Sequence, residues 1–423
     1  MGRNILISFL GKTNYSKTIY QLEGKECSTP TFTPMDALRE YYPFEFCYVF
    51  GTADSSWDYL LKEEFKNIDL SKEDFIRQKS SLAIRMRDHK IKPEIIHYGK
   101  NKHELEENLK IIINALIDLR DGDKIFIDIT YSFRSIPLFA MNVIQYLKEV
   151  SPLNIEIGGV FYGMFLAKDP STGIVPLVDM GPTIELMDWI KAASEFKDHQ
   201  TADKFASLLG RNDLKQEAER MQSYIAINSV THLRKSVTEF KNLWLNVSDS
   251  IHKRLVSPAV LDFPDNISKR GEGKEYLILA KLSDLQWKQG QYLASITSCW
   301  EALISYVWSI YKSHNNKGYP KSFCFNIISK HLCGKEYFYY DSLPSIDNEF
   351  REKIDDFRGY RNMMVHADEK KGYELDADMI DKELKETRRQ IIESIRTNII
   401  GPVAYRIVSS ENFGNDLKDK KSK

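Results

Sequence analysis

Apolar and polar positions follow two different periodicities over the first part of the chain. Short apolar runs predict strands at residues 5–10, 46–50, 94–97, 125–129 and 157–166, with a later edge strand at 175–178. Between them, apolar residues recur with helical spacing at 103–120 and 136–150, and turn residues bound both segments. Strands that alternate with helices are typical of a parallel sheet covered by helices, so we expect an α/β domain here.

From residue 183 onwards only the helical periodicity of apolar residues remains. Apolar spacing predicts helices at 183–209 and 214–255. Pro258, Pro264 and the run 269–274, which is rich in glycine and charge, then indicate a loop and a domain boundary. We therefore expect a helical connector that ends near residue 270.

Five further helices are predicted beyond that boundary, at 275–288, 292–312, 321–332, 345–367 and 376–407. Their apolar and aromatic content, including Trp300 and Trp308, favours a helical bundle. The last residues, 415–423, are strongly charged, and we expect them to be disordered. The chain therefore divides into an α/β domain with a parallel sheet (1–182), an all-α connector (183–270), an all-α bundle (271–410) and a charged tail (411–423).

Overall charge gives little indication of a partner. The 59 basic and 60 acidic residues leave a net charge of −1, so any contact with nucleic acid must come from a local patch. The five cysteines show no C-x-x-C spacing, which favours reduced thiols over disulfides or a zinc site. No apolar run approaches the roughly 18 residues of a membrane span, so we expect a cytoplasmic protein without a membrane partner.

Small and polar residues follow three of the predicted strands. Ligands of such sheets bind beyond the carboxyl ends of the strands, where hydroxyls, backbone amides and an arginine suit a phosphate-bearing ligand. Ordinary turn chemistry is the alternative explanation for these loops, and the lone glycines do not form the G-x-G-x-x-G pattern of a dinucleotide site. The candidate ligand-binding residues are Gly11 and Asn14; Gly51 and Thr52; and Thr130, Tyr131, Ser132, Phe133 and Arg134.

A second candidate site lies near the C-terminal end, at Arg361, Asn362 and His366. A histidine can take or return a proton near neutral pH, and an arginine can hold phosphoryl oxygens as negative charge builds. Together they suit cleavage of RNA by its own 2′-hydroxyl, without a metal ion. On a helix, however, Arg361 and His366 project about 140° apart, so convergence requires the arginine to curl round or a partner helix to supply a second copy. The alternative is a surface histidine and an arginine paired with Asp355 or Asp356.

Three motifs together carry a resemblance to a known family. The stretch from Asp128 to Leu138 (DITYSFRSIPL) resembles the fourth-strand motif of CRISPR-associated Rossmann-fold (CARF) sensor domains, although the commoner form has His and Gly where this chain has Tyr131 and Ser132. Phe9-Leu10-Gly11 followed by Asn14-Tyr15 is similar to the first loop of the same domains. Arg361-Asn362-x-x-x-His366 is similar to the R-N-x-x-x-H signature of HEPN ribonucleases. The combination resembles the CARF–HEPN ribonucleases of type III CRISPR systems.

The resemblance implies a Rossmann-like CARF domain, a helical connector and a HEPN bundle in a homodimer or higher oligomer. Paired CARF domains would bind a cyclic oligoadenylate, and Arg361, Asn362 and His366 of paired HEPN domains would form one metal-independent site that cleaves single-stranded RNA to 2′,3′-cyclic phosphate ends. No cofactor is expected. We favour cyclic tetra-adenylate as activator because its four-fold symmetry contains a dimer's two-fold, a condition that a six-membered ring also meets; the Tyr131 departure leaves ring size and any cleavage of the ligand open. The alternatives are a sensor with a silent HEPN scaffold and a ligand-gated transcription regulator.

Overall fold

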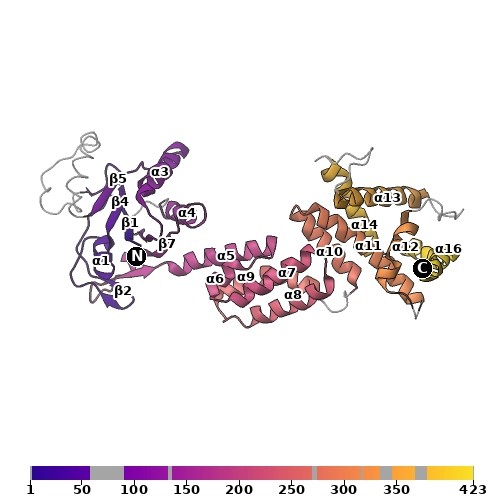
Figure 1. The fold of residues 1–423 in the computed structure, drawn as a ribbon. Helices are drawn as coiled ribbons and strands as arrows, with labels where there is room; N and C mark the ends of the chain where they lie inside the picture. Colours follow the sequence, from indigo (N-terminus) through magenta and orange to yellow (C-terminus); the bar gives the residue numbers. More distant parts are fainter. Residues whose placement is uncertain are drawn as a thin grey trace. The chain divides into compact units, whose positions relative to one another are not determined.

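The computed structural model describes residues 2–57, 90–131, 136–268, 274–315, 318–333, 345–366 and 379–422. The chain divides into two compact units, Met1–Glu185 and Leu186–Lys423 (Figure 1). Each unit is described by itself below.

The first unit contains an eight-stranded sheet in the order β3-β2-β8-β7-β6-β1-β4-β5. Most neighbouring strands are parallel, and the antiparallel pairs are β2–β3 and β7–β8. The prediction of a parallel, helix-covered sheet is therefore confirmed for most strand pairs, whereas the two antiparallel pairs make the sheet mixed. The strands are β1 Asn4–Leu10, β2 Tyr20–Leu22, β3 Lys25–Glu26, β4 Phe46–Gly51, β5 Ile91–Ile95, β6 Lys124–Asp128, β7 Glu156–Gly163 and β8 Val175–Asp179.

Helices cover both faces of this sheet (Figure 1). Successive residues of a strand point to opposite faces, so in β1 the side chains of Ile5 and Ile7 pack into one core and those of Leu6 and Leu10 into another. The first core also takes in residues of α3 and α4, and the second takes in residues of α1. This sandwich fixes the carboxyl ends of β1, β4 and β6 along one edge. The helices are α1 Pro34–Tyr41, α3 Lys102–Ala115 and α4 Ile136–Glu149.

Two strand predictions were wrong, one in its residue bounds and the other in the strand's place in the sheet. The strand expected at 94–97 is β5, Ile91–Ile95, which among the described strands pairs with β4 alone and contains Pro93. A proline cannot donate to a strand ladder and is tolerated at an edge. The strand expected at the edge, β8, lies between β7 and β2 instead. The short β2–β3 hairpin, which the apolar pattern did not reveal, covers that side of β8.

The second unit is helical in its described residues. One continuous core runs from Trp189 to Leu417 and includes both the predicted connector and the predicted bundle. No helix in the described part of the chain is long and apolar enough to cross a membrane. The helices are α5 Gly181–His199, α6 Asp203–Leu209, α7 Asn212–Ala226, α8 Val230–Leu245, α9 Ile251–Ser268, α10 Glu275–Lys288, α11 Tyr292–His314, α12 Lys321–Cys333, α13 Ser345–His366, the π-helix Met379–Leu384, α14 Lys385–Arg396, α15 Gly401–Ser409 and α16 Glu411–Ser422.

The connector helices differ from the prediction. The segment expected as one helix at 183–209 divides into α5 and α6 after Gln200, and that at 214–255 divides into α7, α8 and the start of α9, with Asn228 at the first break. Both residues have positive φ, which a hydrophobic pattern cannot signal. Pro258 and Pro264 do not mark a loop: both lie inside α9, where Pro264 is buried with Val260. Tertiary packing has overridden the local preference of proline for a helix end.

The bundle agrees more closely, because α10 to α13 begin at the predicted residues. The last predicted helix, 376–407, instead divides into a π-helix, α14 and α15, with Asn398 at positive φ before α15. The expectation of a disordered tail was wrong. Residues 411–422 form α16, which buries Phe413 and Leu417, two apolar residues one helical turn apart among the charges.

All five cysteines are free and buried. Burial raises the pKa of the Cys47 and Cys324 thiols to about 11 and that of Cys333 to about 12. It also raises the pKa of Cys299. These four thiols are therefore protonated at neutral pH.

Candidate functional site

The loops after β1 and β4 are joined to each other by hydrogen bonds. Ser55 Oγ donates to the Leu10 carbonyl oxygen at 2.7 Å, and the backbone N–H of Ser56 donates to the Gly11 carbonyl at 3.0 Å. Ser56 Oγ also donates to the Thr13 carbonyl at 2.9 Å. Two of the three loops proposed from sequence therefore form one surface at the carboxyl edge of the sheet, where ligands of such folds bind.

The third loop, after β6, reaches the same surface through Gly11 and Tyr131. A Cβ atom added to Gly11 would lie 3.0 Å from the Tyr131 carbonyl oxygen, so the two backbones approach as closely as a residue without a side chain allows. The Gly11 N–H donates to the Tyr15 hydroxyl at 3.1 Å. Asn14 is exposed on this surface. Ser132, Phe133 and Arg134 lie outside the described residues.

Gly51 and Thr52 act within their own loop. A Cβ on Gly51 would come within 2.7 Å of the Trp57 ring. Thr52 is buried; its N–H donates to Ser55 Oγ at 2.9 Å, and its carbonyl accepts from Trp57 Nε1 at 2.9 Å. In this structure both residues hold the loop in shape, and direct contact with a ligand stays a prediction.

The buried carboxyl group of Asp128 stabilises the start of the loop after β6. Asp128, at the end of β6, accepts hydrogen bonds from Ser8 Oγ at 2.8 Å and from the Thr130 N–H at 3.0 Å. Thr130 Oγ1 in turn accepts from the Gly163 N–H at 2.8 Å. Burial raises the pKa of Asp128 despite these donors. Thr130 thus links β6 to β7, and its side chain positions the loop that follows.

Tyr131 is the centre of an aromatic cluster. Its ring meets Tyr15 edge-on with centroids 4.4 Å apart, and it packs on Phe165 at 5.5 Å. Its hydroxyl lies 3.5 Å from that of Tyr20, which is fully buried on β2. Burial raises the pKa of Tyr131 to about 12, so the phenol is neutral. Sequence reasoning singled out Tyr15 only as part of a motif, and it missed Tyr20 and Phe165, since neither lies next to a recognisable signal.

The second candidate site lies on α13. Arg361 Nη1 donates to Asn362 Oδ1 at 2.9 Å, and Arg361 Nε is buried without a hydrogen-bond partner among the described residues. The alternative pairing of Arg361 with an aspartate is not seen: Asp355 instead pairs with Arg358 at 2.8 Å. His366 is the last residue of α13, and its side chain lies outside the described part.

The bond between Arg361 and Asn362 bears on the geometry of this site. Neighbouring helical residues project about 100° apart, whereas Asn362 and His366, four residues apart, share one stripe. To reach Asn362, the Arg361 guanidinium must lean around α13 toward that stripe. The Arg361 guanidinium is therefore bonded toward the stripe of Asn362, and its convergence with the His366 side chain stays a prediction.

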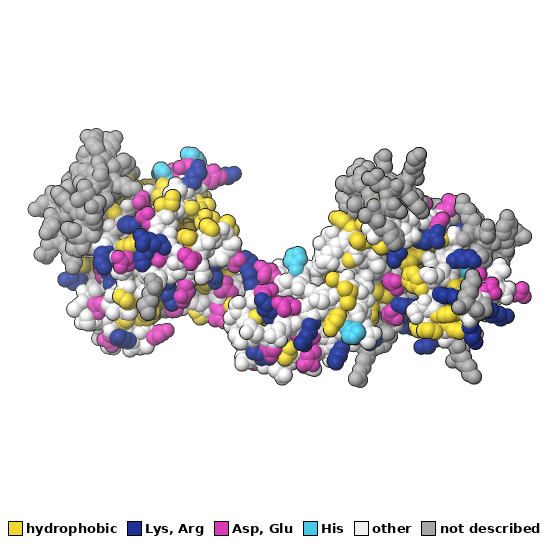
Figure 2. Space-filling model, viewed as in Figure 1, with side chains coloured by type: hydrophobic (Ala, Val, Ile, Leu, Met, Phe, Trp, Pro, Cys, Tyr) yellow, Lys and Arg dark blue, Asp and Glu magenta, His cyan; other side chains and the backbone are white. Residues whose placement is uncertain are grey.

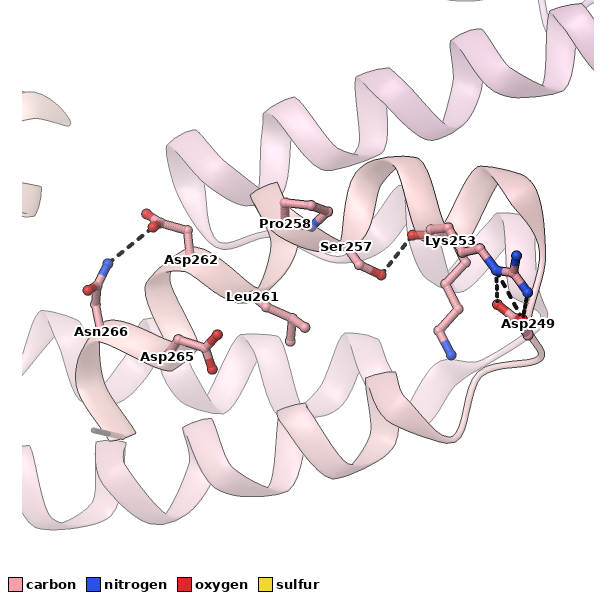
Figure 3. A pocket seen from close by; sticks show the side chains of 9 residues that line it. Asp249, Lys253, Ser257, Pro258, Leu261, Asp262, Asp265 and Asn266 are labelled. Carbon is pink, nitrogen blue, oxygen red and sulfur yellow. Dashed lines mark hydrogen bonds and ion pairs between the residues drawn. The ribbon is translucent and has the colours of Figure 1, made fainter. Parts of the chain in front are cut away.

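A separate pocket of about 600 Å³ is lined by residues of α9 and by Asp249 just before it (Figure 3). Its charged groups already pair with each other or with the chain. Arg254 Nε donates to Asp249 Oδ1 at 3.0 Å, and Asp262 accepts from Asn266 at 3.2 Å. Lys253 Nζ donates to the Leu245 carbonyl at 3.1 Å. None of the ligand-binding or catalytic residues predicted from the sequence lines this pocket.

Basic and acidic side chains are mixed on the face of each unit that Figure 2 shows, in keeping with the net charge of −1. Among the described residues, no group of three or more His, Cys, Asp or Glu side chains is placed to hold a metal ion.

Comparison with known proteins covers most of the chain. Residues 5–165 match the family described as "CRISPR system endoribonuclease Csx1, CARF domain", and residues 185–274 match "CRISPR-associated protein MJ1674, second domain". The chain is 28% identical over 417 residues to CRISPR-associated protein MJ1674 of Methanocaldococcus jannaschii, covering 87% of this chain. It spans 63% of the length of that curated relative. Among solved structures, Enterococcus italicus Csm6 bound to cyclic hexa-2′-fluoro-hexa-dAMP aligns with a TM-score of 0.39 and 12% identity, covering 100% of this chain and 99% of that one.

Proposed function

We propose that this chain, a CRISPR-associated protein with a CARF domain at residues 5–165, is an RNA endonuclease switched on by a cyclic oligoadenylate. In this proposal the first unit binds the ligand and the second unit cleaves single-stranded RNA. The chain acts as a homodimer, which brings together two ligand-binding surfaces and two copies of α13. The cellular role is antiviral defence in a type III CRISPR system.

The ligand-binding half of the proposal rests on the converging loops. The β1, β4 and β6 loops meet at one edge of the sheet, where Asn14 is exposed and Gly11 lies against Tyr131. Backbone amides at such an edge suit the phosphates of a cyclic oligonucleotide. Arg134 adds a guanidinium that can bind phosphate bidentately. A ring with two-fold symmetry contacts both copies of this surface equally in a dimer, and cyclic tetra-adenylate is our preferred ligand.

The catalytic half of the proposal rests on α13. His366 would take the proton of the 2′-hydroxyl or return one to the leaving 5′-oxygen, and two copies in a dimer could divide these roles. The Arg361 guanidinium would stabilise charge on the phosphoryl oxygens. Asn362 would hold that guanidinium in place, as its 2.9 Å hydrogen bond suggests. Attack by the 2′-oxygen gives a 2′,3′-cyclic phosphate and a free 5′-hydroxyl.

One observation carries the proposal furthest. The CARF match and the Arg361-Asn362-x-x-x-His366 helix occur in the same chain, and Arg361 leans toward the Asn362 stripe while its Nε stays without a partner among the described residues. A structural arginine would be expected to use its donors in ion pairs, as Arg358 does with Asp355.

A cleavage assay tests the proposal. Labelled single-stranded RNA and DNA are incubated with the full chain, with or without EDTA, and with or without cyclic tetra- or hexa-adenylate. We expect RNA cleavage that requires one of the two rings, persists in EDTA and leaves 2′,3′-cyclic phosphate ends. Ligand binding without cleavage would indicate a sensor with a silent bundle, and ligand-dependent DNA binding would indicate a transcription regulator. Loss of all cleavage in EDTA, with the fold intact, would contradict the metal-independent mechanism.

A further inference from the structure

Four polar side chains form a row in the core of the second unit, between α10 and α11. Ser283 and Gln286 lie one turn apart on α10, and Ser295 and Ser298 lie one turn apart on α11. All four are 0% exposed. Ser295 Oγ donates to the Ser283 carbonyl oxygen at 2.6 Å, and Ser298 Oγ lies 2.6 Å from Gln286 Oε1. Apolar groups of the same shape can replace buried hydrogen-bonded pairs at little cost in stability, so stability alone does not explain this polar row.

One end of the polar row reaches the connector. Asn228 lies in the turn between α7 and α8, where its φ is 54°. Its Oδ1 accepts a hydrogen bond from Gln286 Nε2 at 3.0 Å and lies 2.6 Å from Ser298 Oγ. Gln286 Nε2 also donates to the Ile225 carbonyl oxygen, at the C-terminal end of α7, at 2.9 Å. Side chains therefore join the connector to α10 and α11 at the place where α7 ends and α8 begins.

The other end of the polar row reaches α14. Ser283 Oγ accepts from Arg388 Nη1 at 3.1 Å, and the same nitrogen donates to Asp284 Oδ1 at 2.7 Å. Arg388 is 7% exposed, and its Nε has no hydrogen-bond partner among the described residues. α14 packs against α11 and against α13, the helix of the proposed catalytic residues. Buried polar contacts thus extend from the α7–α8 turn to a helix that touches α13.

The three side chains at the connector end cannot satisfy all of their contacts at once. The Ser298 hydroxyl has one proton but lies 2.6 Å from two oxygen atoms, Asn228 Oδ1 and Gln286 Oε1. Reversing the Asn228 amide lets it donate to Ser298, but it then sets an N–H group of Asn228 against one of Gln286. Reversing the Gln286 amide would set its oxygen against the Ile225 carbonyl oxygen. Each arrangement leaves one contact without a proton, so alternative hydrogen-bond patterns compete at this site.

We propose that Asn228, Gln286 and Ser298 form a switch through which the connector regulates the proposed ribonuclease site. In one state Ser298 donates to Asn228, and α11 is bonded to the connector. In the other state Ser298 donates to Gln286, and this bond stays within the bundle. Packed cores move between discrete arrangements rather than deforming continuously, so a change at this end of the polar row alters the packing of α14 at the other. The inference rests on the proposed function and names how its cleavage site is regulated.

The first test compares Ser298→Ala with Ser236→Ala in the full chain. Ser236 is a buried serine of α8 whose hydroxyl donates to Glu217, outside the polar row, so the second variant is a matched control. RNA cleavage is measured without ligand and at saturating cyclic tetra- or hexa-adenylate. Ser298→Ala should lower the ratio of activated to ligand-free cleavage about tenfold, which corresponds to about 1.4 kcal/mol of coupling free energy. Ser236→Ala should keep the ratio of the unsubstituted chain.

The second test does not depend on cleavage. Asn228→Gly removes the amide side chain and keeps a residue suited to positive φ. Amide hydrogen exchange in α14, at the far end of the polar row, should become at least about tenfold faster in this variant. Exchange in α12, which contributes no residue to the row, should stay the same, and so should exchange in α14 of Ser236→Ala.

An unchanged activation ratio in folded Ser298→Ala would overturn the switch. So would equal acceleration of exchange in α12 and α14 of Asn228→Gly, because that result indicates a general loss of stability. Failure of the proposed function has a different signature, namely no RNA cleavage by the unsubstituted chain with either cyclic oligoadenylate. In that case the exchange measurement alone decides whether the α7–α8 turn is coupled to α14.

Discussion

Nη1 of Arg361 donates a hydrogen bond to Oδ1 of Asn362 at 2.9 Å, although the two side chains leave the helix in different directions. The Arg361 guanidinium therefore bonds to Asn362 instead of forming an ion pair with Asp355 or Asp356. In the proposed mechanism this gives Asn362 a positioning role, which can be separated experimentally from proton transfer.

Asn362→Ala should lower the RNA cleavage rate about tenfold and leave its pH dependence unchanged. Hydrogen bonds to charged groups are worth about 1.5–3 kcal/mol, and about 1.4 kcal/mol corresponds to tenfold, so loss of part of this bond's effect gives that magnitude. Single-turnover cleavage across pH 5–9 is the measurement. Asn362→Gln should recover part of the rate because it keeps an amide acceptor. Full activity in Asn362→Ala would show that the bond has no catalytic importance.

His366→Ala should lower the cleavage rate by at least about 10², the lower end of general acid–base contributions. Affinity for the cyclic oligoadenylate should stay the same, because the proposed ligand surface lies in the other unit. Cleavage kinetics and calorimetric titration of the ligand measure the two effects on one preparation. A collapse of ligand affinity would contradict the assignment of separate sites.

Arg134→Ala should raise the activating ligand concentration by about 10² or more. A charged hydrogen bond is worth about 1.5–3 kcal/mol, and a symmetric dimer loses two of them per ring. Arg134 lies outside the described residues, so this prediction rests on its place in the loop after β6. Dose–response curves with cyclic tetra- and hexa-adenylate are compared with those of the unsubstituted chain, and ligand-free cleavage serves as the control. An unchanged midpoint would remove Arg134 from the site.

Tyr131→Ala should reduce both stability and ligand affinity, whereas Tyr131→Phe should do little. The ring touches Tyr15 and Phe165, so its removal loosens the loops after β1 and β6; for a partly buried ring the cost is about 2–3 kcal/mol, below the about 3–5 of a fully buried aromatic. The hydroxyl pair with Tyr20, at 3.5 Å, is long and adds little. Thermal unfolding and ligand titration measure the two quantities. If Tyr131→Phe lost as much ligand affinity as Tyr131→Ala, the hydroxyl itself would contact the ligand.

Docking of α16 should weaken as pH falls from about 7 to 5. His331 Nε2 lies 2.9 Å from Asp416 Oδ2, and burial lowers the pKa of His331 even though Asp416 opposes the shift. A pKa lowered by folding means that the unfolded state binds more protons, so this stability is present above the unfolded value of about 6.5 and is lost as pH falls through the folded value. Protection factors for amide hydrogen exchange in residues 411–422, which correct for the intrinsic slowing of exchange at lower pH, should therefore decrease toward pH 5. His331→Gln should flatten this dependence, and an identical dependence in that variant would contradict the assignment.

Sequence predicted the candidate site residues that lie next to strands, but it did not predict those that join the sites through tertiary contacts. Gly11, Thr130 and Tyr131 were recognisable because they lie just after strands, where chain order alone places them at the carboxyl edge of the sheet. Tyr20 and Phe165 were not, because they reach Tyr131 only through the β2–β3 hairpin and the segment between β7 and β8. The bond from Arg361 to Asn362 depends on a side-chain rotamer, which a sequence pattern does not specify.

For the fold, long periodic segments were predicted well and single-residue interruptions were not. The boundaries of α10 agree with the sequence at both ends because apolar residues recur through the whole helix. Gln200, Asn228 and Asn398 each break a predicted helix by adopting positive φ, a backbone state that leaves the hydrophobic rhythm intact. In α16, net charge concealed two apolar residues, Phe413 and Leu417, which the bundle buries.

The burial of every native cysteine makes the unmodified chain a ready background for thiol labelling. Maleimides react with exposed thiolates, and Cys47, Cys299, Cys324 and Cys333 are both shielded and protonated at pH 7, while Cys27 is shielded. A single cysteine introduced at an exposed position would then carry nearly all of the dye. Energy transfer between dyes on mixed donor- and acceptor-labelled copies would report self-association of the chain, with and without a cyclic oligoadenylate, without any native cysteine being removed.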